Sequence, residues 1–188
     1  MARAPRECNL GDPPLKGLVM PTLREAAEEF LAQPRIAVAG VSRDSKQPAN
    51  LIYRRLRDSG HEVFAVNPHA DEVEGARSYP SVTAIPGAVD GVVVVTPADV
   101  SEGIVADCVE AGVPRVWLHR GLGPGSSSEA AVALGRANGL SVIPGGCPNM
   151  FGATADPGHR CILALLHVTG KLPRPIAATA PAAQLVEV

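Results

Sequence analysis

RIAVAGVSRDSKQPAN, residues 35–50, is the stretch that decides the fold class. Residues 35–40 form a short apolar run that is typical of a buried strand. A polar loop follows, and Pro48 suits the first turn of a helix that we expect over residues 48–58. A strand that leads through a loop into a helix is the first half of a βαβ unit, so the stretch predicts a parallel sheet.

The same alternation of short apolar runs and amphipathic segments continues on both sides of this stretch. Upstream, Thr22 and Glu25 form a capping box, and we expect the helix that it starts to stop before Pro34. Downstream, the predicted elements are, in turn, strands at 62–66, 76–79 and 90–95, a helix at 99–111, a strand at 115–118, a helix at 128–138, a strand at 140–143 and a helix at 158–169. This alternation predicts a Rossmann-like α/β fold, in which a doubly wound, mostly parallel sheet carries helices on both faces.

The bulk composition fits one domain with unstructured ends. The chain has 188 residues, 46% of them hydrophobic, which is enough to bury one core. We assign this domain to residues 21–170. Residues 1–20 are rich in proline and glycine without periodicity, and we expect a mobile leader there. Residues 171–188 are rich in proline and alanine, and we expect a frayed tail.

Charge, aromatic content and cysteine usage argue against several classes of partner. A formal net charge of −2 and 3% aromatic residues give no support to nucleic-acid binding. No apolar run approaches the roughly 18 residues of a membrane span, and the first 20 residues hold no secretory signal, so we expect no membrane partner. The four cysteines include no CxxC pair, which favours reduced thiols in a cytoplasmic protein.

The expected topology also places a ligand crevice. If the predicted strands lie in the order 3-2-1-4-5-6, the order reverses between the first strand and the fourth. These two strands end at Gly40 and just before Thr96. Ligands of open α/β sheets bind where the loops part at such a reversal. We therefore expect the site at residues 40–43 and at Thr96 and Pro97.

The loop after the first strand lacks the GxGxxG pattern of a dinucleotide site. Instead Ser42, Arg43 and Lys46 bring a hydroxyl and two positive charges to a helix start, which suits an anion. An NAD site also places an acid after the second strand to hold the ribose diol, where this chain has Asn67. These residues favour coenzyme A or NADP, which carry a phosphorylated ribose, over NAD. The alternative is that Arg43 and Lys46 are ordinary solvated loop charges.

Five segments together resemble a known family. They are RIAVAGVSRDSKQPAN, VFAVNPHADEVEG, RSYPSVTAIPGAVDGVVVVTP, RVWLHRGLG and SVIPGGCPNMFG. In this order they are similar to the small stand-alone CoA-binding proteins, which in turn resemble the nucleotide-binding domain of the succinyl-CoA synthetase α-subunit. The resemblance covers about residues 22–168 and implies a Rossmann-like fold with coenzyme A as its cofactor.

The resemblance also implies which residues contact the cofactor. They are Gly40, Val41, Ser42, Arg43, Lys46, Asn67, Pro68, His69, Thr96 and Pro97. His119 is added to them as a departure, since many relatives have a glutamine at that position. The ligase relatives carry a second domain with a phosphorylated histidine, and this chain ends before one. We therefore expect binding without acyl-CoA ligation by this chain alone.

Three other kinds of chemistry stay open at this point. An NAD(P)-dependent oxidoreductase is compatible with the fold. A thiol enzyme is conceivable because Cys147 follows two glycines and His119 ends a nearby strand, while the plainer interpretation is a buried structural cysteine. Cys147, His159 and Cys161 are candidate metal ligands, but their spacing matches no strong zinc signature. Trp117 is expected in the core.

The sequence thus predicts a protein that binds coenzyme A or an acyl-CoA and has no catalytic activity of its own. Such a protein acts as a carrier, a sensor or a partner subunit of an enzyme, and it is also compatible with a homo-oligomer. The residues near the first loop predict the ligand and leave open whether the ligand undergoes a reaction.

Overall fold

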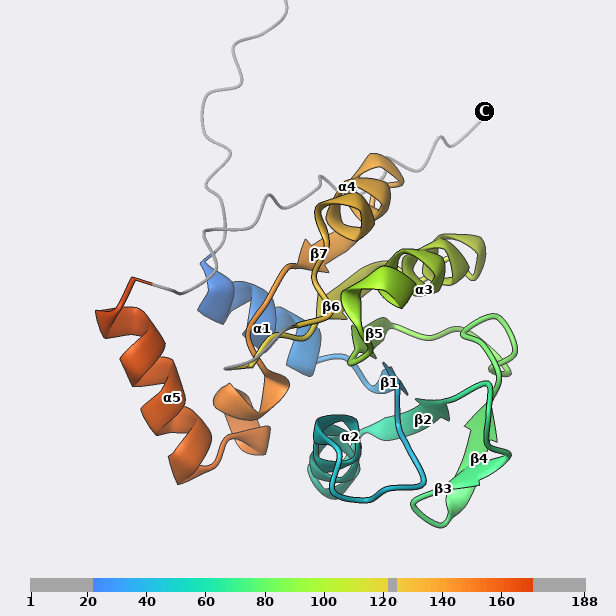
Figure 1. Cartoon of the computed structure of the whole chain (residues 1–188), viewed down its shortest axis with the longest axis horizontal. Coiled ribbons are helices and arrows are strands. Elements are labelled where there is room, and N and C mark those ends of the chain that lie inside the picture. The colour runs from blue at the N-terminus through green and yellow to red at the C-terminus, as the bar shows by residue number, and fades with distance from the viewer. Residues whose placement is uncertain (1–21, 122–124, 171–188) are drawn as a thin grey trace, which may run out of the picture.

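The computed structural model describes residues 22–121 and 125–170, which form a central sheet with helices around it (Figure 1). The strands are β1 (Arg35–Ala39), β2 (Glu62–Val66), β3 (Glu72–Val73), β4 (Ala76–Tyr79), β5 (Gly91–Val94), β6 (Arg115–Leu118) and β7 (Ser141–Ile143). The helices are α1 (Leu23–Leu31), α2 (Pro48–Asp58), α3 (Ala98–Glu110), α4 (Glu129–Ala137), α5 (Pro157–Val168) and the short 3-10 turns η1 (Pro148–Met150) and η2 (Gly152–Thr154).

The sheet confirms the predicted fold class and strand order. Its seven strands lie in the order β3-β4-β2-β1-β5-β6-β7, and every pair is parallel except β3 with β4. The order 3-2-1-4-5-6 expected from the sequence is therefore present, with β3 added at one edge. The sequence pattern missed β3 because its two residues are too short to show a period of two.

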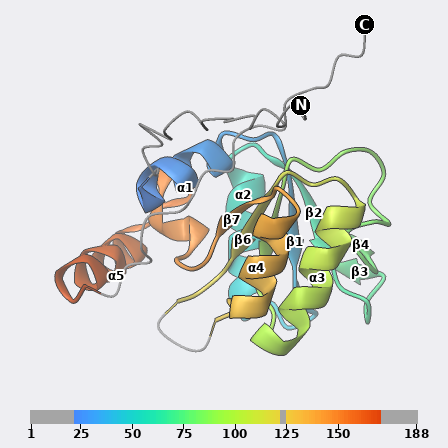
Figure 2. The same cartoon turned by 90° about the horizontal axis from the view of Figure 1, so that it is seen from above.

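The helices cover both faces of the sheet (Figure 2). Side chains alternate along β1, so Ile36 and Val38 pack with α1 and α2 while Ala37 and Ala39 face the cluster that includes residues of α3 and α4. All four side chains are buried, as expected of a parallel strand covered on both sides. The two faces are thus two separate hydrophobic clusters with the sheet between them.

Trp117 of β6 lies in the core, as predicted, and organises the cluster beneath α1. Its ring is fully buried and meets the ring of Phe30 edge-on, with centroids 5.4 Å apart. The indole Nε1 donates a hydrogen bond to the carbonyl of Gly145 at 2.9 Å. A buried Trp needs a partner for this N–H, so the bond also fixes the loop that follows β7.

The first helix, α1, begins at the capping box that the sequence predicts. The capping box forms as predicted: the Glu25 amide donates to Thr22 Oγ1 and the Thr22 amide donates to the Glu25 carboxylate. The predicted leader, residues 1–20, and the predicted tail, residues 171–188, lie outside the described residues. Within residues 22–121 and 125–170, no helix has the length and apolar character needed to cross a bilayer.

The contact between α1 and β5 gives a prediction for stability. A Cβ on Gly91 would lie 2.7 Å from the Phe30 ring, which is held against Trp117 and cannot withdraw freely. We expect Gly91→Ala to lower the free energy of unfolding by about 1–3 kcal/mol through overpacking. Urea unfolding followed by Trp117 fluorescence measures this change.

Gly103→Ala is the matched control, because nothing lies within 4 Å of a Cβ at this exposed position in α3. This change should raise the free energy of unfolding by roughly 0.5–1 kcal/mol through helix propensity. Equal stability of the Gly91→Ala variant and the unchanged protein would show that Phe30 does not set the spacing of α1 from the sheet.

Candidate functional site

The carboxyl ends of β1 and β5 lie side by side where the sequence predicts a ligand crevice. From β1 the chain turns into α2 on one face, and from β5 it turns into α3 on the other. The loops of residues 40–47 and 95–97 therefore part at this point, which is the reversal that the sequence predicted. In open α/β sheets this is where ligands bind.

Gly40 lets these two loops approach each other. Its φ is +101°, and a Cβ there would lie only 2.5 Å from the Val95 carbonyl oxygen. The Gly40 amide donates to the Val66 carbonyl, and the Val95 amide donates to the Ala39 carbonyl. No residue with a side chain fits between these neighbours without moving the backbone. Gly40 thus fixes the floor of the crevice.

Asn67 ties the first loop to the end of β2. Its Nδ2 donates to the carbonyl of Val41 at 2.7 Å, and its Oδ1 accepts the amide of His69 at 2.8 Å. Val41 is fully buried, so the loop begins as part of the core and becomes exposed from Arg43 onward. The asparagine therefore orders two of the loops expected to bind the ligand.

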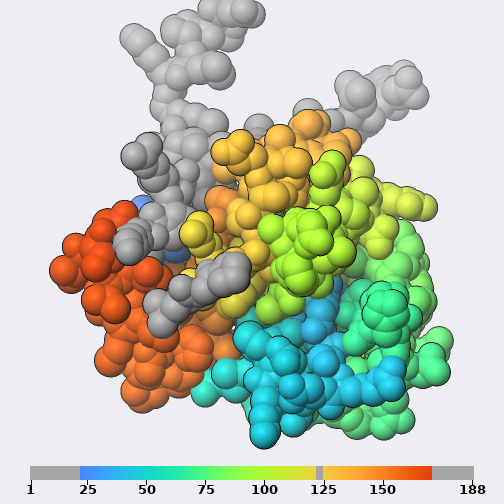
Figure 3. All heavy atoms as spheres, in the orientation of Figure 1, coloured from blue at the N-terminus to red at the C-terminus, as the bar shows by residue number. Residues whose placement is uncertain are grey.

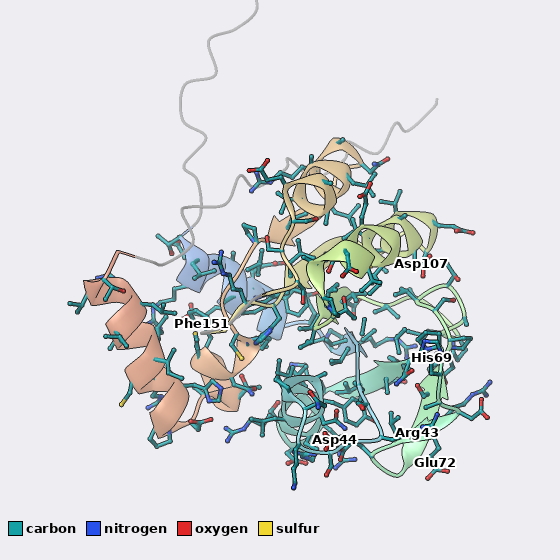
Figure 4. The ribbon with its side chains drawn as sticks, viewed as in Figure 1. Arg43, Asp44, His69, Glu72, Asp107 and Phe151 are labelled. Carbon is teal, nitrogen blue, oxygen red and sulfur yellow. The ribbon has the colours of Figure 1, made fainter. Side chains whose placement is uncertain are left out.

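Arg43 lies over the turn that follows β2. Its guanidinium donates to the carbonyl of His69. Figure 4 shows Arg43 and His69 on the same side of the molecule, beside Glu72 of β3. A pocket of about 440 Å³ opens here, and it is lined by Arg43, Pro68, His69, Ala70, Asp71 and Glu72. The pocket offers one cation and two carboxylates to a ligand.

Asp71 and Glu72 are pocket residues that the sequence argument missed. An NAD site has its ribose-binding acid directly after the second strand, where Asn67 stands, whereas these two carboxylates follow a four-residue turn. Carboxylates accept hydrogen bonds from hydroxyl and amino groups. Their place in the lining suits the uncharged part of a nucleoside, while Arg43 suits its phosphate.

The other predicted site residues on these loops are Thr96, Pro97 and Lys46, and no hydrogen bond joins them to one another. Thr96 lies against Gly40, and its hydroxyl is 3.3 Å from the Ser101 hydroxyl. Pro97 is exposed at the start of α3. Lys46 is exposed, and its amide donates to the Asp44 carboxylate. The first loop, the turn after β2 and Thr96 thus follow the carboxyl ends of three neighbouring strands, β1, β2 and β5.

His119 lies one strand further along the same edge, directly after β6. Its amide donates to the Val94 carbonyl, and its own carbonyl accepts the Ser126 amide. Burial lowers the pKa of His119 to about 4, and the nearby His159 adds to this shift. The imidazole is therefore neutral at neutral pH, which removes an attraction for phosphate and leaves a hydrogen-bonding group.

Asn50 on α2 is a third residue that the sequence did not indicate. It is completely buried, and its Oδ1 accepts the Ser42 amide at 3.0 Å while its Nδ2 donates to the Ser42 carbonyl at 2.6 Å. The loop is thus held by an asparagine on each side, Asn67 at Val41 and Asn50 at Ser42. A polar residue on the buried face of a helix was the available signal.

The thiol interpretation of Cys147 is not supported by its surroundings. The side chain is buried in the cluster under α1, and this burial raises the pKa of the thiol to about 12. An activated nucleophile needs a lowered pKa, since the thiolate is the reactive form. Cys147 therefore fits the plainer interpretation of a packing residue.

The surroundings of Cys147, His159 and Cys161 do not support a metal site either. His159 is engaged with the Asp156 carboxylate at 2.6 Å, and Cys161 is exposed on α5. Across residues 22–121 and 125–170, no three His, Cys, Asp or Glu side chains are grouped so that they could hold a metal ion. The candidate set of Cys147, His159 and Cys161 thus has no geometric support.

Two relatives with curated descriptions bracket the chain in size. An uncharacterized protein of Bacillus subtilis, YneT, is 28% identical over 123 residues, which cover 65% of this chain and 88% of that protein. The alpha subunit of an ADP-forming acetate–CoA ligase II of Pyrococcus furiosus is 35% identical over 92 residues, which cover 48% of this chain. This chain spans 20% of the length of that ligase subunit.

Solved structures likewise include one small protein that matches over most of its length and one large enzyme that matches over a part of its length. A hypothetical protein from Pyrococcus horikoshii has a TM-score of 0.62 and 26% identity, covering 73% of this chain and 92% of its own. A dinucleotide-forming acetyl-coenzyme A synthetase 1 of Ca. Korarchaeum cryptofilum, solved with phosphate and ADP, has a TM-score of 0.53 and 31% identity. The match covers 61% of this chain and 26% of the synthetase.

The family model described as CoA binding domain matches residues 34–153, which include β1 to β7, the crevice and every candidate residue named above from Gly40 to His119. The resemblance noted from the five segments is thereby confirmed. This chain belongs to the CoA-binding domain family.

Proposed function

We propose that the chain binds coenzyme A or an acyl-CoA in the crevice between β1 and β5. The observation that carries this proposal is the loop of residues 40–47, which is held open by two asparagines beside the Arg43 pocket. The proposed contacts are Gly40, Val41, Ser42, Arg43, Lys46, Asn67, Pro68, His69, Thr96, Pro97 and His119. The curated ligase relatives are named for coenzyme A chemistry, which supports the same ligand.

The start of α2 suits the phosphates of this ligand. Gln47 at its N-cap makes no capping hydrogen bond with its side chain, and the first turn holds no acidic residue. By contrast, Thr22, Ser128 and Asp156 cap α1, α4 and α5 with their own oxygens. Pro48 at the first position has no N–H and the Asn50 amide donates to the Gln47 carbonyl, so α2 offers an anion the Ala49 amide and the positive end of its dipole.

The phosphorylated ribose is proposed to lie beside Arg43, Lys46 and Asn67. Both cations are exposed on the loop, and Arg43 is already oriented by the His69 carbonyl. A neutral carboxamide at position 67 does not repel a phosphate as a carboxylate would. This arrangement favours coenzyme A over a ligand with an unphosphorylated ribose.

The proposed role is binding without chemistry by this chain alone, as a carrier, a sensor or a partner subunit of a ligase in the cytoplasm. The raised pKa of Cys147 argues against a thiol nucleophile at this position. Leu165 and Val168 on α5 are 56% and 84% exposed, which supports a homo-oligomer or a partner protein.

Calorimetric titration tests the proposal directly. Coenzyme A should bind with a measurable heat, and Arg43→Ala combined with Lys46→Ala should raise the Kd by roughly a hundredfold, since each hydrogen bond to a charged group contributes about 1.5–3 kcal/mol. The matched control removes two exposed arginines elsewhere, Arg24 of α1 and Arg160 of α5, and should leave the Kd unchanged. Absence of heat at millimolar ligand, or undiminished binding by the first variant, would refute the site.

The ribose phosphate is tested by changing the ligand instead of the protein. 3′-Dephospho-CoA should bind about tenfold more weakly than coenzyme A, because it lacks the charge that Arg43 and Lys46 are proposed to meet. The difference between the two ligands should shrink as salt is added. A rise in Tm with NADPH and none with coenzyme A would instead favour the NAD(P)-dependent oxidoreductase.

Thiol reactivity separates binding from thiol catalysis. With its pKa raised to about 12, Cys147 should stay unmodified by iodoacetamide below pH 9 in the folded protein, while the exposed Cys161 reacts. Peptide mass spectrometry at a series of pH values gives the midpoint for each cysteine. A Cys147 midpoint at or below the free-thiol value of about 8.5 would restore the case for a nucleophile.

A further inference from the structure

Glu74 occupies a backbone conformation that disfavours its residue type. It forms the turn between β3 and β4 together with Gly75, and the two residues have φ values of +51° and +70°. Among the described residues other than glycine, Glu74 is the one with a positive φ. Such tight turns favour Asn or Asp followed by Gly, so a glutamate here costs free energy that another interaction has to offset.

The side chain of Glu74 reaches from this turn into α2. One carboxylate oxygen, Oε1, accepts hydrogen bonds from Asn50 Nδ2 at 2.7 Å and from the Arg54 guanidinium at 2.6 Å. Only 11% of the Glu74 side chain is exposed, which strengthens both contacts. Figure 3 shows the corresponding surfaces in contact, with α2 (cyan) beside the green hairpin.

Both partners of Glu74 hold the loop that is proposed to bind coenzyme A. Asn50 brackets Ser42, taking its amide and donating to its carbonyl, and Arg54 donates to the Ser45 carbonyl at 3.1 Å. Glu74 Oε1 is therefore linked to the backbone of Ser42 through Asn50 and to the backbone of Ser45 through Arg54. Neither position contacts Glu74 itself.

The geometry explains why a hydrogen-bond acceptor is needed at position 74. Asn50 is fully buried, and its Nδ2 has two hydrogens, of which one meets the Ser42 carbonyl and the other meets Glu74. An acceptor at position 74 therefore holds the carboxamide with its Oδ1 toward the Ser42 amide. Without that acceptor a buried N–H is unpaired, and Arg54 loses its charge partner.

We propose that Glu74 is a positioning residue that sets the ligand-binding shape of the loop of residues 40–47 through Asn50 and Arg54. This inference rests on the function proposed above, since the loop is the proposed phosphate site. It adds a residue of the β3–β4 hairpin to the determinants of affinity and accounts for the disfavoured turn conformation.

The test compares two substitutions at position 74 in protein that is folded at 25 °C. Glu74→Ala should raise the Kd for coenzyme A about tenfold, because the loop has to be ordered at the expense of binding. Glu74→Gln keeps an acceptor for Asn50 but removes the charge that faces Arg54. Its Kd should therefore lie between that of the unchanged protein and that of Glu74→Ala. A Kd for Glu74→Ala within twofold of the unchanged protein would overturn the inference.

Val73→Ala is the matched control, because Val73 is buried in the same hairpin and makes none of these hydrogen bonds. It should lower the Tm and leave the Kd unchanged. A Kd raised equally by Val73→Ala and Glu74→Ala would mean that the hairpin matters only for stability, which contradicts a positioning role.

Hydrogen exchange without ligand separates this inference from the proposed function. Glu74→Ala should speed exchange in the peptide that contains the Ser42 amide, and Val73→Ala should not. If the unchanged protein fails to bind coenzyme A, the proposed function is wrong, and the exchange result still decides whether Glu74 positions the loop. Unchanged exchange in Glu74→Ala would overturn the inference.

Discussion

The close approach of Gly40 to the Val95 carbonyl is the constraint on which the crevice depends. The parallel sheet brings β1 and β5 side by side, and their chains leave toward opposite faces. A side chain at position 40 would collide at 2.5 Å with that carbonyl, so any other residue would separate the two loops. Glycine at this position lets the backbone itself form the floor, which leaves the side chains that follow free to meet a ligand.

The loop that follows Gly40 is held by the proposed ligand contact Asn67 and by two residues, Asn50 and Glu74, that are not proposed to touch the ligand. Asn67 fixes Val41, Asn50 fixes Ser42, and Glu74 fixes Asn50 from a separate hairpin. Each bond is buried or half-buried, where an unpaired partner is costly, so the arrangement is held firmly. This rigidity supports a protein that holds a nucleotide in a defined pose. Burial holds the Cys147 thiol neutral, which does not suit a nucleophile at that position.

The sequence was sufficient for the fold and for one side of the candidate site. Alternating strands and helices predicted a parallel, doubly wound sheet, because the βαβ rule leaves few alternatives. The strand order was assumed, and the sheet has that order; Gly40 and Asn67 follow strand ends in the chain. Asn50, Glu74 and the acids of the Arg43 pocket escaped notice because their roles depend on contacts across 8 to 24 positions and on a two-residue strand. The burial that sets the pKa of Cys147 is likewise a property of packing and not of the GGCP motif.

The most direct test of the central claim is a nuclear magnetic resonance titration that follows backbone and asparagine side-chain amides as coenzyme A is added. The account predicts that the largest shifts fall in residues 40–47, in the turn at Asn67 to His69 and at Thr96, together with the Nδ2 protons of Asn50 and Asn67. Shifts confined to the other edge of the sheet, around α4 and β7, or no shifts at saturating ligand, would contradict it.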